Sequence, residues 1–74
     1  MQEHELEDQL YRYALQGDPE EMIEAARYFE AAPPTATNNH FDRAVTLYSK
    51  AGLLDTALDL ASRSFIHFIT NIIM

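Results

Sequence analysis

The stretch that decides the fold is residues 41–61, FDRAVTLYSKAGLLDTALDLA. It holds two amphipathic segments on either side of Gly52, and a glycine at that place is typical of a left-handed helix cap. Two helices joined by so short a connection are antiparallel neighbours. Their axes come closest where small side chains face each other. The alanines that we expect at the crossing of this helical hairpin are Ala44, Ala51, Ala57 and Ala61.

The two helices of this hairpin are predicted at about residues 40–51 and from residue 54 onward. We expect Leu47, Tyr48, Leu54 and Leu58 to fill the flanks of the crossing. In the second helix, five apolar residues share one face at helical spacing. They are Leu54, Ala57, Leu58, Ala61 and Phe65.

A further helix is predicted upstream, at about residues 5–16. Its apolar residues recur at i, i+4, i+7 and i+8, which places them on one face. These residues are Leu6, Leu10, Tyr13 and Ala14. Gly17 follows the last of them closely, and a left-handed C-terminal cap is expected there.

The clearest start signal in the chain is GDPEEM, residues 17–22. Asp18 is a favourable N-cap, Pro19 fits the first helical position, and Glu21 completes a capping-box-like D-x-x-E pattern. A helix is therefore predicted at about residues 19–31. Its apolar stripe consists of Met22, Ala25, Ala26 and Phe29.

The run AAPPTATNNH, residues 31–40, separates the two pairs of helices. Its two prolines cannot continue a helix, so a loop is expected, with Asn39 as the N-cap of the helix that follows. The chain is therefore predicted to consist of an acidic first hairpin at 1–32, a Pro/Thr/Asn loop at 33–39, and a second hairpin with an apolar tail at 40–74.

The two pairs of helices resemble each other in sequence. MIEAARYFEAA and FDRAVTLYSKAG both place an alanine three or four residues after an apolar residue, then an aromatic residue and a further alanine. Repeated helical hairpins indicate a solenoid. The predicted fold is all-α, with two antiparallel helical hairpins of a tetratricopeptide-like α-solenoid. The residues expected to pack the helices together are Ala25, Phe29, Ala44, Tyr48, Ala51, Gly52, Ala57 and Ala61.

The net charge lies entirely in the first part of the chain. The formal charge of −7 arises within residues 1–30, and the rest is neutral. Nucleic acid and anionic membranes are not expected as partners, because both require clustered Lys and Arg. The chain has no cysteine, which excludes disulfides and fits a reducing compartment. We find no targeting signal and no apolar stretch long enough to span a membrane.

No group of residues predicts catalysis or cofactor binding. Glu20 and Glu21 are explained by helix capping, and two glycines are too few for a phosphate-binding loop. His4 with Glu7 and Asp8 could form a metal site on one helical turn. A solvated acidic face is the favoured interpretation, because structural metal sites use more and better spaced ligands. We therefore expect no enzyme, no metal site and no cofactor.

The C-terminal segment, residues 65–74, is apolar over most of its circumference if it is helical. We expect Phe65, Phe68, Ile69 and Ile72 to form a partner surface, through which the isolated chain self-associates. The segment is interpreted either as a helix that packs under a following repeat or as non-native sequence. A membrane-associated peptide that acts through this tail is an alternative, although it lacks the basic face that such anchors use.

Three segments together carry a family resemblance: PEEMIEAARYFE, DRAVTLYSKAG and TALDLA. They resemble the tetratricopeptide-like region of the intraflagellar transport protein 140 family, the large WD-repeat subunits of the intraflagellar transport A complex. The resemblance covers roughly residues 6–61. It implies a scaffold without catalysis, because family members join N-terminal β-propellers to a long helical solenoid that contacts other subunits.

The resemblance also implies partners, place and process. The implied partners are other subunits of the A complex, and the implied location is the cilium and the cytoplasm. The implied processes are retrograde transport and the delivery of membrane proteins into cilia. The chain departs from the family pattern at the linker 31–40 and after Ala61, where SRSFIHFITNIIM follows. These departures favour a truncated product or a fragment. A vesicle-coat-type scaffold is a second alternative, because such proteins also join propellers to solenoids.

Overall fold

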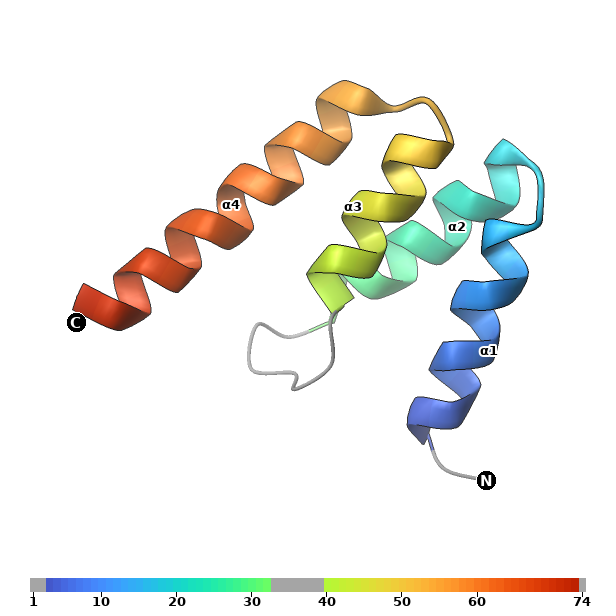
Figure 1. Ribbon diagram of the computed structural model, residues 1–74, viewed down its shortest axis with the longest axis horizontal. Helices are drawn as coiled ribbons and strands as arrows, with labels where there is room; N and C mark the ends of the chain where they lie inside the picture. The colour runs from blue at the N-terminus through green and yellow to red at the C-terminus, as the bar shows by residue number, and fades with distance from the viewer. Residues whose placement is uncertain (1–2, 33–39, 74) are drawn as a thin grey trace.

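The computed structural model describes residues 3–32 and 40–73. It contains four helices, α1 (Glu3–Leu15), α2 (Pro19–Glu30), α3 (His40–Lys50) and α4 (Leu54–Ile73) (Figure 1). All regular secondary structure in these described residues is helical. The predicted all-α fold is confirmed, and each predicted helix is found within one or two residues of its expected bounds.

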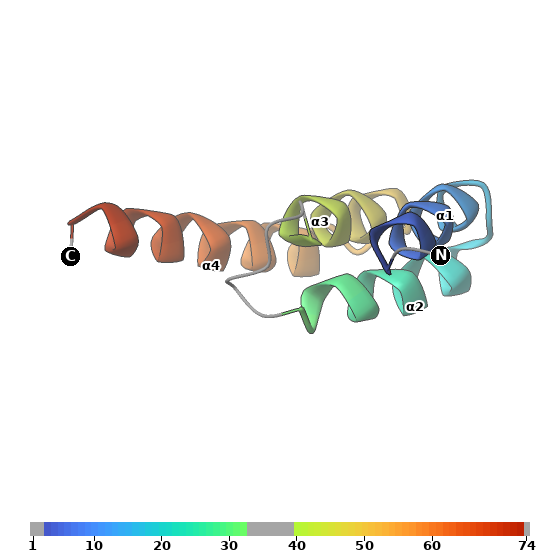
Figure 2. The same cartoon turned by 90° about the horizontal axis from the view of Figure 1, so that it is seen from below.

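The helices form a flat assembly with α3 at its centre. α2 lies beneath α1 and α3, and α4 packs along the other side of α3 (Figures 1 and 2). The principal extents are 39 × 33 × 13 Å. The second half of α4 continues beyond the end of α3 (Figure 1). Successive antiparallel hairpins stacked in this way are the arrangement of a tetratricopeptide-like solenoid.

The start of α2 is formed as the sequence predicts. Asp18 has an extended backbone, with φ −82° and ψ 172°, and its side chain accepts a hydrogen bond of 2.9 Å from the backbone N–H of Glu21. Pro19 occupies the first helical position, where the missing N–H is not needed. Local chemistry therefore determines where this helix begins.

Gly17 does not form the left-handed cap expected at the end of α1. Its φ is not positive, so this prediction was wrong. The side chain of Glu21 folds back over this residue, and a Cβ atom at position 17 would meet its carboxylate, which is the flexible end of that side chain, and would lie 3.1 Å from Glu21 Cβ. A larger residue at position 17 would therefore require the side chain of Glu21 to shift.

Gly52 does form a left-handed cap, with φ 92°. The N–H of Leu53 donates to the carbonyl of Tyr48 at 2.9 Å, and the N–H of Gly52 donates to the carbonyl of Ser49 at 3.1 Å. These two bonds make the complete Schellman pattern. No atom lies within 4 Å of the place a Cβ would occupy, so the backbone conformation, rather than space, favours glycine here.

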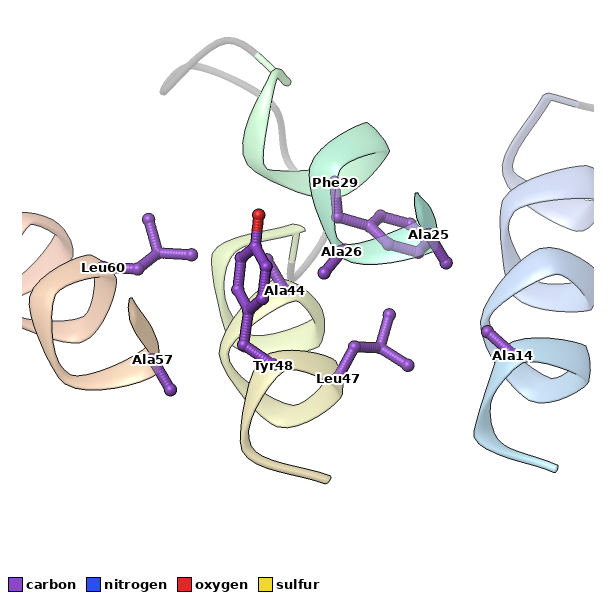
Figure 3. Close-up of a cluster of buried hydrophobic side chains, with 9 residues drawn as sticks. All are labelled: Ala14, Ala25, Ala26, Phe29, Ala44, Leu47, Tyr48, Ala57 and Leu60. Carbon is purple, nitrogen blue, oxygen red and sulfur yellow. The ribbon is translucent and has the colours of Figure 1, made fainter. Parts of the chain in front are cut away.

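The core is one cluster to which all four helices contribute (Figure 3). Five of its nine residues are alanines, which lets the helices approach closely. The largest fully buried side chains are Phe29, Leu47 and Leu60. The members are Ala14, Ala25, Ala26, Phe29, Ala44, Leu47, Tyr48, Ala57 and Leu60.

The contact between α3 and α4 differs from the predicted one. Ala44 and Ala57 are buried in it, whereas Ala51 is half-buried and Ala61 is exposed. The reason is that Leu60 is fully buried. Neighbouring residues on a helix point about 100° apart, so burial of Leu60 directs Ala61 away from the core.

The same rotation exposes two leucines that were expected in the flanks of this contact. Leu54 is 61% exposed and Leu58 is 67% exposed. Most residues of the apolar face predicted for α4 therefore point away from the core and into solvent. The predicted loop at 33–39, with its proposed N-cap Asn39, lies outside the described residues.

Candidate functional site

Glu7 on α1 is a buried carboxylate that links three helices. Tyr28 Oη on α2 donates a hydrogen bond to Glu7 Oε2 at 2.9 Å, and His40 Nε2 on α3 lies 3.0 Å from the same oxygen. Glu7 is only 9% exposed and His40 only 8%. A buried carboxylate is tolerated where polar partners replace its water. These contacts therefore specify how α1 docks on the other helices.

The packing face of α1 is not the one predicted from its apolar residues. Leu6, Leu10 and Tyr13 are 52%, 36% and 76% exposed. Of the predicted face only Ala14 is buried, and Glu7, two turns earlier on the helix, is buried with it. The prediction failed because a carboxylate lies on the side of α1 that packs.

Arg43 on α3 makes a second link to α1. It forms an ion pair with Asp8. Its guanidinium carbon also lies 4.9 Å from the ring centroid of Tyr11 and 5.6 Å from that of Phe29. A planar guanidinium can stack on aromatic faces while it pairs with a carboxylate. Arg43 thus joins the polar contacts of α1 to the aromatic part of the core.

Glu30 is the last residue of α2 and links it to both helices that follow. Tyr48 Oη on α3 donates to Glu30 Oε1 at 2.6 Å, and Arg63 Nη2 on α4 donates to Glu30 Oε2 at 3.0 Å. Arg63 Nε also pairs with Asp59 Oδ2, one turn earlier on α4, at 3.3 Å. A single carboxylate therefore holds the end of α2 against the second hairpin.

These contacts shift the pKa values of the two partners in opposite directions. The hydrogen bond from Tyr48 holds the pKa of Glu30 below its ordinary value; burial opposes this, and Arg63 supports it. Burial, followed by the hydrogen bond to Glu30, raises the pKa of Tyr48 to about 12. At neutral pH the carboxylate is thus charged and the hydroxyl protonated, the combination that this hydrogen bond needs.

Sequence reasoning missed this polar network. A signal was present for Glu7, because Glu7, Tyr11 and Ala14 share one helical face. Glu30 likewise stands one turn after the buried Ala26. A carboxylate within an apolar stripe indicates a buried polar partner, since charged groups are rarely buried unless paired.

An uncovered apolar surface extends along α4, and we call it the outer face of α4. Its exposed residues are Leu54, Leu58, Ala61, Phe65, Ile66, Ile72 and Ile73. A shallow depression of about 430 Å³ lies within it, lined by Leu58, Ala61, Ser62, Phe65 and Ile66. Contiguous exposed apolar surface of this kind marks protein contact sites.

The predicted site residues fall into distinct places. Five of the expected packing residues are buried together, namely Ala25, Phe29, Ala44, Tyr48 and Ala57. Gly52 lies in the exposed turn, Ala51 is half-buried and Ala61 is on the outer face of α4. Of the expected partner surface, Phe65 and Ile72 are exposed and Ile69 is half-buried, while the side chain of Phe68 is not among those described.

Two further kinds of feature, metal-ligating groups and membrane spans, bear on function. Among the side chains described, no three His, Cys, Asp or Glu residues gather closely enough to hold a metal ion. Within residues 3–32 and 40–73, no helix is both long enough and apolar enough to cross a membrane.

Comparison with known proteins gives one family. No solved structure matches the chain. Residues 1–74 match the family described as the tetratricopeptide (TPR) domain of intraflagellar transport proteins 140 and 172. The match includes the linker 31–40 and the segment after Ala61, where the sequence departs from the resemblance. Tetratricopeptide-type domains are generally protein-interaction modules without catalysis, and this family places such a domain in cilium-associated intraflagellar transport. The chain, whose described residues form helices arranged as in a tetratricopeptide array, belongs to this family of intraflagellar transport TPR domains.

Proposed function

We propose that this chain is a non-catalytic scaffold segment of the intraflagellar transport A complex that acts in retrograde transport. The observation that carries the proposal is the family match over residues 1–74. The family description names two transport proteins. The likeness of residues 19–30 and 42–61 to the protein 140 family favours the A complex.

The chemistry of the described side chains supports a scaffold role. The buried carboxylate of Glu7 and the carboxylate of Glu30 both take part in contacts between helices. Tyr28, His40 and Tyr48 are their partners. These groups hold one helix against another, so their role in the proposal is to keep the solenoid rigid.

The outer face of α4 is the proposed surface for protein contact. In a stack of hairpins each unit covers a face of its neighbour, and this face has nothing over it among the described residues. Phe65, Ile69 and Ile72 from the predicted partner surface lie on it or beside it. We place the chain at the cilium and in the adjacent cytoplasm.

The test is recovery of transport subunits from ciliated cells that express the tagged chain. We expect subunits of the A complex in the precipitate. The control is an equally tagged tetratricopeptide chain from a protein outside ciliary transport, which should recover none. Recovery of vesicle-coat subunits instead would favour the coat-type alternative and overturn the proposal.

A liposome flotation assay examines the membrane alternative. The purified chain is mixed with neutral vesicles and with anionic vesicles. We expect it to remain in the unbound fraction with both, because the charge of −7 disfavours an anionic surface. Flotation with neutral vesicles that is lost on removal of residues 65–74 would support the membrane-associated peptide.

A further inference from the structure

We propose that the outer face of α4 pairs with the same face of a second copy of this chain, in an antiparallel dimer with two-fold symmetry. This inference rests on the proposed role of that face in protein contact and names its partner. The spacing, the size and the charge of the residues along α4 support it.

The apolar positions of this face have the spacing of a coiled coil. Positions 54, 58, 61, 65, 68 and 72 follow one another in alternating steps of four and three residues. This is the a/d pattern of helices that pair along their length. We call these six positions the α4 seam. Its residues Leu54, Leu58, Ala61, Phe65 and Ile72 are all exposed in the single chain, and Phe68 continues the spacing in the sequence.

The α4 seam has the same spacing in both directions. An antiparallel copy therefore brings each seam position opposite another one: 54 meets 72, 58 meets 68, and 61 meets 65. A surface that matches itself in this way suits a two-fold dimer, because the same patch is used on both subunits.

The sizes of the central residues also fit. Ala61 is the only small residue of the α4 seam, and the antiparallel alignment places Phe65 of the second copy opposite it. The depression of about 430 Å³ that includes Leu58, Ala61 and Phe65 lies at this point. Symmetry repeats the contact, so each copy both offers a phenyl ring and receives one. A large side chain set against a small one lets helix axes approach closely.

The charges of α4 favour the antiparallel direction. Its charged residues are Asp55, Asp59 and Arg63, all in the first half. Arg63 donates a hydrogen bond to Glu30 of α2, so its side chain lies on the side of α4 that faces α2. A parallel pair would bring the aspartates of both copies to the same end, whereas an antiparallel pair separates them. The helix dipoles also oppose each other favourably in the antiparallel pair.

The shape of the chain allows this pairing. The second half of α4 extends beyond α3 (Figure 1). In an antiparallel dimer that half lies along the first half of the other α4. The part of each helix that its own chain leaves uncovered is thereby covered by the second copy.

The first experiment measures the mass of the purified full chain by analytical ultracentrifugation over a range of concentrations. We expect a monomer–dimer equilibrium with dimer at tens of micromolar. Leu58→Glu and Phe65→Glu should each weaken the dimer by about tenfold or more, because a charge would be buried in an apolar contact. Leu6→Glu is the matched control, since Leu6 is also exposed but lies on α1, and it should leave the dimer unchanged.

Circular dichroism of each variant shows whether it is folded, and two seam variants are used so that one folding failure does not decide the result. A wild-type chain that stays monomeric at these concentrations overturns the inference, as does association that continues beyond the dimer. A seam variant that remains folded and dimeric also overturns it. None of these results depends on transport subunits, so they are distinct from failure of the proposed function.

The second experiment tests direction by disulfide trapping, which is simple because the natural chain has no cysteine. Residues 54 and 72 of one helix are about 27 Å apart, too far for a disulfide within one chain. The double variant Leu54→Cys with Ile72→Cys should form a covalent dimer under mild oxidation. Leu54→Cys alone should form it much more slowly. Rapid trapping of the single variant would show a parallel pair and overturn the proposed arrangement.

Discussion

Tyr48 on α3 donates a 2.6 Å hydrogen bond to the carboxylate of Glu30 at the end of α2, although the two residues are 18 positions apart in the chain. The same carboxylate accepts a hydrogen bond from Arg63 on α4. Three helices therefore meet at one side chain. The properties of this contact can be tested directly, because the tyrosine and the carboxylate both titrate.

Replacing Tyr48 with Phe removes the hydroxyl and keeps the ring. We expect a loss of about 1.5–3 kcal/mol in the free energy of unfolding at pH 8, because a hydrogen bond to a charged acceptor is lost. The pKa of Tyr48 is raised to about 12 in the folded chain, above the value of about 10 for an unfolded tyrosine. The stability that it contributes is thus fully present below pH 10 and is lost as the pH rises to about 12.

The measurement for Tyr48→Phe is denaturant unfolding at pH 8 and at pH 11.5. The difference in the free energy of unfolding between wild type and variant should be smaller at pH 11.5 than at pH 8. Tyr11, Tyr13 and Tyr28 are present in both proteins and serve as the internal control. A difference that is equal at both pH values would contradict the assignment of this titration to Tyr48.

Gly52→Val should destabilise the chain by roughly 1 kcal/mol or more. The φ of 92° is unfavourable for a β-branched residue, while no atom near the site would clash with the new side chain. The cost would therefore arise from the backbone alone. Thermal melts followed by circular dichroism provide the measurement. Gly52→Asn is the control and should cost less, because Asn tolerates this conformation.

Ala44→Leu should destabilise by about 1–3 kcal/mol through overpacking of the core. Ala44 is completely buried, between helices that contribute Ala26 and Ala57. Ala31→Leu is a matched control at an exposed position. Chemical unfolding of both variants compares them. If Ala44→Leu unfolds at the same denaturant concentration as Ala31→Leu, the close approach of α3 to its neighbours would be refuted.

Glu7→Ala should loosen α1 while the other helices remain in place. Glu7 contacts both Tyr28 and His40, and loss of a buried charged acceptor costs about 1.5–3 kcal/mol. We expect faster hydrogen exchange of the α1 amides and little change in α3. Glu5→Ala changes an exposed glutamate on the same helix and should have almost no effect. Equal exchange rates in the two variants would argue that apolar contacts hold α1.

A chain that ends at Ser64 should remain folded but lose its self-association. Among the α4 side chains that the structure describes, the buried ones are Ala57 and Leu60, and both precede this point, so their part of the core is kept. The removed segment includes Phe65, Ile66 and Ile72, which are exposed. Sedimentation of the shortened chain should show a monomer, with circular dichroism as the check on folding. Dimers of the shortened chain would place the contact elsewhere.

The sequence was sufficient to predict where helices begin and end. Asp18 with Pro19 starts α2, and Gly52 ends α3 with the hydrogen bonds donated by its own N–H and by that of Leu53, because such signals depend on neighbouring residues alone. The buried alanines Ala25 and Ala44 could also be predicted, since they recur at helical spacing within apolar stripes.

The rotation of each helix about its own axis could not be predicted in the same way. Whether Leu60 or Ala61 enters the core depends on the fit of α4 against α3, and both residues lie in an apolar run. Glu7 is one acid among many in the sequence, and only its partners on α2 and α3 distinguish it from the others. Such contacts join residues far apart in the chain, so local patterns contain little information about them.

Curvature in a stacked-hairpin protein arises from the small rotation between one repeat and the next. Glu30 restrains that rotation twice, because Tyr48 and Arg63 hold it from different helices of the following hairpin. Loss of the carboxylate would remove both of these restraints at once. The curvature between the two hairpins is thus restrained in part by one acid at a helix end.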